Sequence, residues 1–170
     1  MKVRIPQNIF KFEKIKNIIT TNYKIKIICS TDTYSVRHPI LRTEKPIESC
    51  VFEGDDLETT IHFGVFSEEN LVGICSFYKN SHPNILETPQ YQLRGMAVLM
   101  PFQNKSLGKK ILRHAEDFLK EKSDIIIWCN AREIAINFYK KNGYQIIGEP
   151  FHITDIGLHC AMYKVLYSLY

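Results

Sequence analysis

The segment from Tyr91 to Glu116 constrains the fold more than any other part of this chain. An apolar run at 93–99 is typical of a half-buried strand, and Pro101 ends that strand because proline has no backbone N–H to donate. After a short polar loop, a helix is predicted from Ser106 to about Lys122. Its buried face is expected to consist of Leu107, Ile111, Leu112 and Phe118, which recur at helical spacing. The sequence therefore predicts a strand, a tight loop and a helix in succession.

The predicted loop and first helical turn are suited to binding an anion. The first turn of a helix presents unpaired N–H groups and the positive end of its dipole. Gly108 leaves room for a ligand to approach the backbone, while Lys105, Lys109 and Lys110 add positive charge. Neither the phosphate-loop pattern G-x-x-x-x-G-K-[ST] nor the dinucleotide pattern G-x-G-x-x-G fits this segment. The spacing alone is equally consistent with a diphosphate site and with an ordinary solvated basic edge.

Length and composition are those of one ordinary globular domain. The chain has 170 residues, of which 45% are hydrophobic and 24% charged, and its formal net charge is only +4. So small a charge does not indicate a nucleic-acid partner, for which a concentrated basic stripe is expected. No apolar run approaches the length of a membrane span or a signal sequence, so we expect a cytoplasmic protein without a membrane partner. The five cysteines are widely spaced among apolar neighbours, and we interpret them as reduced core residues that bind no metal.

The rest of the chain is predicted to add strands and helices around the central segment. A short helix is expected at 30–41, interrupted by Pro39, and another runs from Asn130 to Gly143. Residues 1–22 are predicted to form an N-terminal extension, which can be helical, ahead of a single domain at 23–170. Strands are expected at 23–29, 59–66, 71–78, 124–129, 144–147 and 157–166.

The loop resembles the acyl-CoA-binding motif of one enzyme family. Its six positions, Gln103 to Gly108, are similar to the pattern [QR]-x-x-G-x-[GA] of the GCN5-related N-acetyltransferase (GNAT) family. The first and last positions match. Ser106 stands where the family usually has glycine, and its side chain can cap the helix.

The segment from Asn130 to Tyr144 resembles a second motif of the same family, N-A-R-x-x-A-x-x-F-Y-x-K-x-G-[FY]. Every named position matches, and the two motifs occur in the family's order and at its separation. The resemblance implies an α/β (α+β) fold: a mixed, strongly twisted sheet with helices on both faces. It also implies that two central parallel strands splay apart, so that the pantetheine arm of acetyl-CoA lies between them.

The same resemblance implies acetyl-CoA as co-substrate, with no metal. Backbone groups of the central strand would bind the pantetheine amides, and N–H groups of the loop would hold the pyrophosphate. The implied cofactor-binding residues are Met96, Ala97, Val98, Gln103, Asn104, Lys105, Ser106, Leu107, Gly108, Lys109, Asn130 and Asn137.

Roles in catalysis are also implied by the resemblance. Tyr139 would lie beside the sulfur and act as general acid, while the Val98 amide could polarise the carbonyl group. The general base stays open between ordered water and five side chains: Glu53, Asp55, His62, Glu149 and His159. Candidates for contacts with the acceptor are His38, Arg42, His62 and His159, together with the stretch 53–56.

The sequence therefore predicts an N-acetyltransferase that transfers acetyl from acetyl-CoA to a primary amine by direct attack in a ternary complex. Because residues 51–90 are acidic, the acceptor is expected to be cationic: a polyamine, an aminoglycoside-like compound, or an amine of a peptide. The alternative is a sensor or structural module that binds acyl-CoA without turnover. The apolar C-terminal end, 165–170, would suit the surface of a homodimer.

Overall fold

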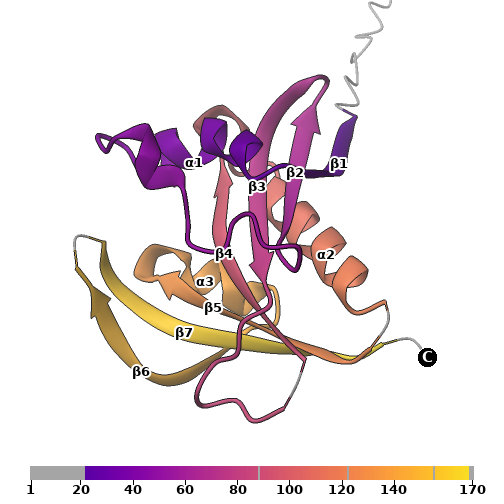
Figure 1. The fold of residues 1–170 in the computed structure, drawn as a ribbon, viewed down its shortest axis with the longest axis vertical. Coiled ribbons are helices and arrows are strands. Elements are labelled where there is room, and N and C mark those ends of the chain that lie inside the picture. The colour runs from indigo at the N-terminus through magenta and orange to yellow at the C-terminus, as the bar shows by residue number, and fades with distance from the viewer. Residues whose placement is uncertain (1–21, 88, 122, 155, 169–170) are drawn as a thin grey trace, which may run out of the picture.

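The computed structural model describes residues 22–87, 89–121, 123–154 and 156–168. A seven-stranded sheet in the order β1-β2-β3-β4-β5-β7-β6 forms its centre (Figure 1). The strands are β1 (Tyr23–Ile28), β2 (Ile61–Ser67), β3 (Asn70–Tyr78), β4 (Gln90–Val98), β5 (Ile125–Arg132), β6 (Gln145–Ile153) and β7 (Gly157–Leu166). The helices are α1 (Tyr34–Leu41), α2 (Leu107–Leu119) and α3 (Ile136–Lys141), and short 3-10 turns occur at Thr31–Thr33, Ile47–Cys50, Met100–Phe102 and Glu133–Ala135.

The sheet is mixed, as predicted. Neighbouring strands pair antiparallel except β4 and β5, which are parallel. This parallel pair is short: only Gln90, Tyr91 and Gln92 of β4 pair with residues 126–128 of β5. Beyond Gln92 the two strands are no longer paired, and this break in the pairing positions the candidate site.

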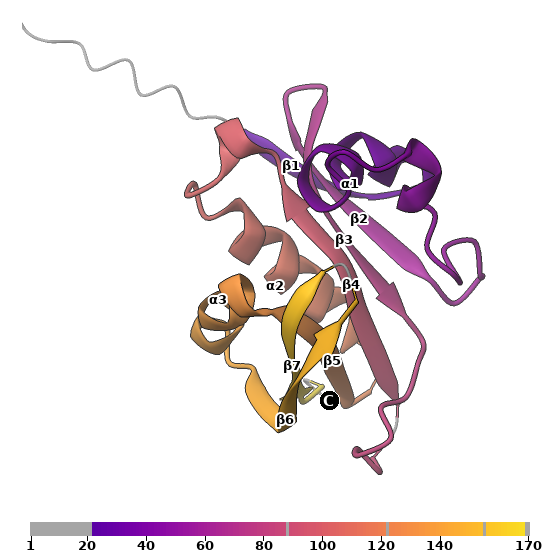
Figure 2. The same ribbon diagram turned by 90° about the vertical axis from the view of Figure 1, so that its left-hand side faces the viewer.

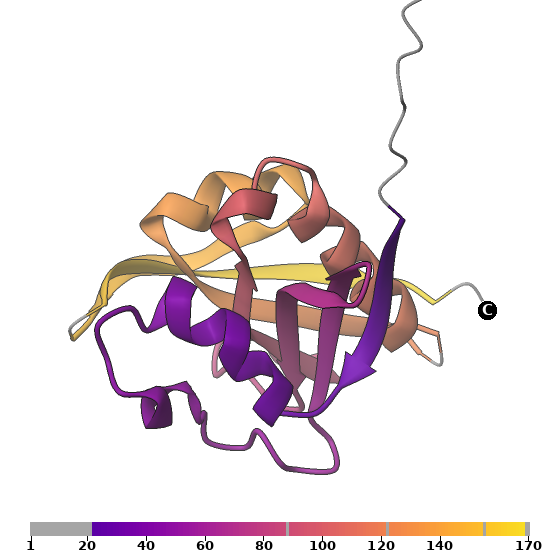
Figure 3. The ribbon, with the colours of Figure 1, turned by 90° about the horizontal axis from the view of Figure 1, so that it is seen from above.

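Helices cover both faces of the sheet, which confirms the predicted architecture (Figures 2 and 3). On one face, α2 and α3 pack over the main core, where Leu107, Ile111 and Leu112 are fully or almost fully buried. On the other face, Val36 of α1 packs against Ile74 of β3 and Ala97 of β4. We call these the α2 face and the α1 face.

The prediction for Phe118 was wrong, because its ring is 42% exposed. Successive residues of a helix turn by about 100°, so a residue six positions after Leu112 points away from the buried stripe. Ala115 and Leu119 continue that stripe and are buried. Phe118 still contacts Phe63 edge-on, with ring centroids 5.6 Å apart.

Three predicted boundaries were also wrong. The strand expected at 144–147 continues as β6 to Ile153. Pro39 does not interrupt α1: it lies inside the helix, which loses one backbone hydrogen bond there and ends two residues later. The helix expected from Asn130 begins later, because β5 continues through Arg132. Residues 130–132 pair with 159–161 of β7 and therefore stay in the sheet.

All five cysteines are free, as predicted, but only four of them are core residues, because Cys29 is exposed. The predicted extension at 1–22 lies outside the described residues apart from Asn22. In the described part of the chain, no helix combines the length and the hydrophobicity needed to cross a membrane.

Candidate active site

The second half of β4 has an unpaired edge on the side of β5. The Leu99 amide donates to the Val72 carbonyl at 2.9 Å, so it points toward β3. Backbone groups of successive strand residues alternate in direction, so those of Val98 point the other way, toward β5. No β5 residue pairs with β4 at this level. The Val98 carbonyl is instead bonded by the side-chain amide of Gln103 at 2.9 Å, which ties the following loop to the open edge.

A bulge at Gly95 interrupts the pairing of β3 with β4. The register shifts between Ile74 and Ser76, and Gly95 has a φ of +62°, a conformation that favours glycine. A Cβ atom at Gly95 would lie 3.0 Å from Arg37 Nε and 3.3 Å from a carbon of the Phe52 ring. Glycine is therefore required here by both conformation and space.

The loop after β4 presents a row of backbone amides. Asn104 and Ser106 both have a φ of +60°, and α2 begins immediately afterwards at Leu107. The amides of 104–109 donate to no acceptor among the described residues, whereas the Lys110 amide bonds the Ser106 carbonyl at 3.0 Å. The expectation that the Ser106 side chain caps the helix was wrong, because the left-handed backbone at this position leaves the cap bond unmade. We call residues 104–109 the amide cradle.

A basic groove adjoins the amide cradle. It has a volume of about 280 Å³ and is lined by Lys109, Arg113, Lys141, Asn142 and Lys164. Lys109 belongs to both features. Lys164 is already paired with Glu116 at 2.6 Å, and the other three cationic side chains next to six unbonded amides make this region suitable for a ligand with several phosphate groups.

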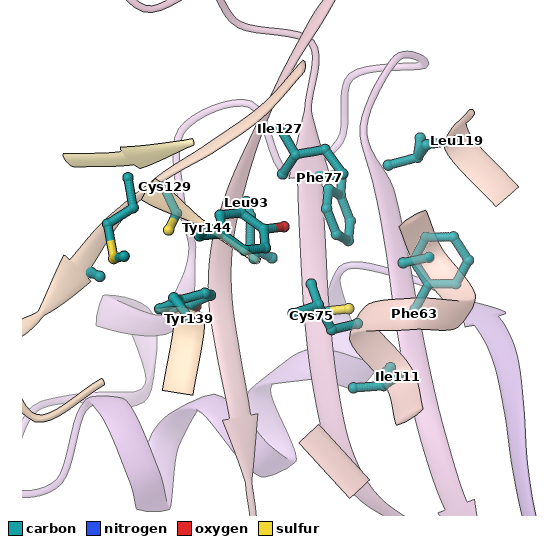
Figure 4. Close-up of a cluster of buried hydrophobic side chains, with 14 of the residues drawn as sticks. Phe63, Cys75, Phe77, Leu93, Ile111, Leu119, Ile127, Cys129, Tyr139 and Tyr144 are labelled. Atoms are coloured by element: carbon teal, nitrogen blue, oxygen red, sulfur yellow. The ribbon is translucent and has the colours of Figure 1, made fainter. Parts of the chain in front are cut away.

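Tyr139 extends from α3 toward β4. Its hydroxyl group lies 3.7 Å from the sulfur of Met96, and its side chain is 7% exposed. Its ring packs edge-on against Tyr144, with ring centroids 5.3 Å apart (Figure 4). Burial, followed by the nearby thiols of Cys129 and Cys75, holds the pKa of Tyr139 well above its ordinary value. The hydroxyl group therefore keeps its proton at neutral pH and is able to donate it.

A closed polar network lies under α1. Arg37 is fully buried and donates to both carboxylate oxygens of Asp55, at 2.6 and 3.0 Å, while Tyr78 also donates to that carboxylate. His62 Nε2 donates to the Asp55 carbonyl at 2.8 Å, so Nδ1 is the acceptor of the Ser76 hydroxyl, also at 2.8 Å.

This network removes two of the five candidate bases. Both ring nitrogens of His62 are engaged in hydrogen bonds. Burial acts to raise the pKa of Asp55, but the hydrogen bonds from Arg37, Tyr78 and the Phe52 amide hold it below its ordinary value. Both oxygens of the Asp55 carboxylate accept hydrogen bonds from Arg37. Both groups have structural partners that occupy the atoms a base would use.

His159 on β7 is as buried as His62, at 4% exposed, but only one of its ring nitrogens is hydrogen-bonded to a described residue. Its Nδ1 lies 2.8 Å from the Gly157 carbonyl and must donate to it, which leaves the lone pair on Nε2. No described residue is hydrogen-bonded to Nε2. His159 stacks on Phe151 and is the register partner of Arg132 at the end of β5.

The remaining predicted site residues are dispersed. His38 contacts the Lys45 carbonyl at 2.8 Å within the loop after α1. Asn130 on β5 and Asn137 on α3 are exposed, as are Glu53 and Glu149. Arg42 lies over the Phe52 ring at 4.9 Å. Among the described residues, no group of three or more histidine, cysteine, aspartate or glutamate side chains is arranged to hold a metal.

Two arginines near this site were missed by the sequence analysis. Arg94 lies over Phe52 and Tyr78, at 5.1 and 4.7 Å from the ring centroids, and Arg132 reaches the end of α1. The sequence could have indicated both, because each arginine directly follows a core residue, Leu93 or Ala131, in a strand. Successive strand residues point to opposite faces, so each arginine side chain is expected on the face opposite that core residue.

The fold and the two motifs define an acyltransferase class, and comparison with known proteins agrees. The family model described as "Acetyltransferase (GNAT) family" matches residues 24–144. The chain therefore belongs to the GNAT acetyltransferase family, whose fold has the mixed sheet described above.

One curated relative and several solved structures are similar to this chain. It is 41% identical over 143 residues to the uncharacterized N-acetyltransferase YitI from Bacillus subtilis strain 168, covering 84% of this chain and 96% of the relative. The crystal structure of the ribosomal-protein-S18-alanine N-acetyltransferase from Escherichia coli is similar with a TM-score of 0.64 and 17% identity, covering 88% of this chain and 96% of that one. The PaiA N-acetyltransferase from Thermoplasma acidophilum, in complex with coenzyme A, gives a TM-score of 0.57 and 17% identity, covering 85% and 99%. These two structures share the fold.

Proposed function

We propose that this chain transfers the acetyl group of acetyl-CoA to a primary amine by direct attack in a ternary complex. The observation that carries this proposal is the loss of pairing between β4 and β5 after Gln92, immediately before the amide cradle. One product bond forms, between the amine nitrogen and the acetyl carbon, while the bond from that carbon to sulfur breaks. The proton lost by the amine balances the proton gained by the thiolate.

The residues present fit acetyl-CoA. The unbonded amides of 104–109 and the adjoining basic groove suit its phosphate groups. The open edge of β4 at Met96 and Val98 suits the amides of the pantetheine arm, because an extended chain can add to an unpaired strand edge. The coenzyme A complex of the PaiA relative is consistent with this assignment.

Tyr139 is proposed as the general acid. In the structure its hydroxyl group donates to the Met96 thioether, which is a weak acceptor. A thiolate is a stronger acceptor, so a departing thiolate in the opening would take over this hydrogen bond. The raised pKa of Tyr139 ensures that the proton is present before the reaction. The Val98 amide, which points toward the same opening, is proposed to polarise the acetyl carbonyl.

His159 is proposed as the base that takes the proton from the amine. The Gly157 carbonyl holds Nδ1 in its protonated form, so Nε2 keeps a lone pair. His159→Asn is the variant of choice, because the asparagine amide can preserve the bond to Gly157 while removing that lone pair. We expect kcat to fall about 100-fold or more.

Thiol release with varied amines tests the proposed function. Initial rates with both substrates varied should give intersecting lines, as expected when both are bound before transfer. Mass spectrometry should find one acetyl group on the amine for each thiol released. Binding of acetyl-CoA without turnover on any amine would overturn the proposed enzyme in favour of an acyl-CoA sensor.

A further inference from the structure

Three half-buried arginines meet on the α1 face of the sheet. Arg42 follows α1, Arg94 lies on β4, and Arg132 ends β5. The guanidinium groups of Arg42 and Arg94 lie 4.9 and 5.1 Å from the centroid of the Phe52 ring. Arg42 Nη1 and Arg132 Nη2 both donate to the Leu41 carbonyl, at 2.9 and 3.4 Å. These contacts join the three charges into one group, which we call the arginine cluster.

The arginine cluster has no acidic partner in the described ranges. The ion pairs found there are Arg37 with Asp55 and two pairs made by lysines. Asp55 is the buried carboxylate under α1, and Arg37 occupies both of its oxygens. Burial, and then repulsion by Arg132 and the other arginines, lowers the pKa of Arg42. Like charges held together without a counter-ion cost stability, so a bound anion would relieve a cost already present.

Most hydrogen-bond donors of the cluster are free. A guanidinium group carries five N–H donors. Arg94 makes one bond, to the Glu53 carbonyl at 3.1 Å, and Arg132 makes the one to Leu41. Arg42 makes two, to the Leu41 and Ser49 carbonyls. All of these bonds are to backbone oxygens, which hold the guanidinium groups in place and leave further donors for a ligand.

The cluster borders the proposed reaction centre. Arg94 lies two residues before Met96 on β4, and Arg132 is the register partner of His159. Tyr139 contacts Met96 from α3, which packs on the opposite face. An acceptor held by the cluster would therefore enter from the α1 face, on the side of His159, while acetyl-CoA occupies the opening between β4 and β5.

We propose that Arg42, Arg94 and Arg132 bind a carboxylate of the acceptor, so that the substrate is an amine that also carries a carboxylate, such as an amino acid. This inference rests on the proposed function for the identity of the reaction. The planar, forked guanidinium group matches a carboxylate with two parallel hydrogen bonds. Asp55, the buried carboxylate on this face, is already paired with Arg37.

This inference differs from the cationic acceptor expected from the acidic segment 51–90. Asp55 from that segment is paired with Arg37, and Asp56 accepts a bond from Ser30. Its other acidic residues, Glu53, Glu58, Glu68, Glu69 and Glu87, are exposed. Glu53 adjoins the arginine cluster through its carbonyl, which accepts a hydrogen bond from Arg94, while its side chain is exposed.

Matched pairs of amines test the inference. Phenylalanine is compared with phenylalaninamide, and lysine with cadaverine, because each pair differs in the carboxylate. We expect kcat/KM to favour the carboxylate-bearing member by at least about tenfold. Arg94→Gln and Arg132→Gln should reduce this preference about tenfold each, through KM of the amine, while the Kd of acetyl-CoA stays unchanged and reports an intact fold. Lys24→Gln, an equal change of charge at an exposed position on β1, should leave the preference intact.

The outcomes separate the inference from the proposed function. Equal transfer to both members of each pair, or a preference that survives both arginine variants, overturns the carboxylate subsite and leaves the acetyltransferase in place. Stronger transfer to O-phosphoethanolamine than to any carboxylate-bearing amine overturns the carboxylate in favour of a phosphate. If no amine is acetylated, calorimetry on the CoA-loaded protein compares the binding of phenylalanine with that of phenylalaninamide. Binding of phenylalanine but not of phenylalaninamide, lost in Arg132→Gln, supports the carboxylate subsite. Equal affinity for the two compounds overturns it.

Discussion

The hydroxyl group of Tyr139 lies 3.7 Å from the sulfur of Met96, and this contact joins the helix after β5 to strand β4. Tyr139→Phe removes the proton donor and leaves the ring in the core. We expect kcat to fall about 100-fold or more, because positioned acids contribute that much, with little change in the Kd of acetyl-CoA. Single-turnover rates and calorimetric titration measure the two quantities separately.

Tyr144→Phe is the matched control for this prediction. Its ring packs against that of Tyr139, but its hydroxyl group lies near Glu116 of α2. The control should therefore keep its rate within about threefold of the original protein. Equal rate losses in the two variants would show that the effect comes from the core and not from a proton donor.

Ser106 tests how the amide cradle is held. Its φ of +60° costs an L-residue about 1 kcal/mol or more, and its side chain is exposed and makes no cap bond. Ser106→Gly should therefore raise the free energy of unfolding by up to about 1 kcal/mol and bind acetyl-CoA at least as tightly. Ser106→Val should lower both the free energy of unfolding and the affinity for acetyl-CoA, since a branched side chain disfavours this conformation. Urea unfolding and calorimetry measure these effects, and tighter binding by the valine variant would contradict them.

The Arg37 and Asp55 pair predicts a specific acid sensitivity. The folded protein holds the pKa of Asp55 below its ordinary value, so the unfolded chain binds the proton more readily. The stabilisation is fully present above the unfolded pKa of about 3.9 and is lost as the pH falls through the lower folded pKa. Asp55→Asn should remove this part of the pH dependence, and it should cost about 3–5 kcal/mol at neutral pH because Arg37 is left unpaired.

Urea unfolding at a series of pH values measures this effect. Asp56→Asn is the control, since Asp56 is exposed and forms one hydrogen bond, to Ser30. Parallel acid destabilisation of the original protein and of Asp55→Asn would refute the assignment.

Gly95 is predicted to be irreplaceable. Gly95→Ala combines a φ of +62° with a Cβ atom only 3.0 Å from the buried Arg37, and we expect it to cost at least about 2 kcal/mol. Gly148→Ala isolates the conformational part, because Gly148 has a φ of +71° and its Cβ would meet only Asn84, at 3.9 Å. Gly148→Ala should lower the free energy of unfolding by about 1 kcal/mol. Equal losses in the two variants would show that crowding at Gly95 is unimportant.

Local patterns were sufficient to predict most of the fold. Pro101, the polar loop and the apolar spacing from Leu107 correctly placed the end of β4 and the start of α2. Two errors were local: Phe118 is off the helical spacing of the buried stripe, and Ser106 has a left-handed backbone. The start of the helix after β5 was predicted wrongly because distant residues decide it. Pairing with β7 keeps residues 130–132 in the sheet although their local sequence favours a helix start. The degree of twist of the sheet stays a prediction.

The site was harder to predict, because its residues come together from distant segments. The Arg37 network unites α1, the loop before β2, and β3, and no sequence spacing links these elements. Arg94 and Arg132 are 38 positions apart, and the contacts of Arg94 with Phe52 and of Arg132 with Leu41 form only in the folded chain. Tyr139 and the loop from Gln103 to Gly108 were identified from the sequence because each lies within a motif that resembles one of the GNAT family. The roles assigned to them stay predictions until they are measured.

Calorimetric titration with acetyl-CoA measures directly whether the open edge of β4 and the amide cradle hold this molecule. We expect saturable binding with one site per chain. Dephospho-CoA, which keeps the pyrophosphate, should also bind. Ser106→Val should weaken both ligands through the cradle they share. The absence of binding at millimolar acetyl-CoA would contradict the account, and the proposed acetyl transfer would fall with it.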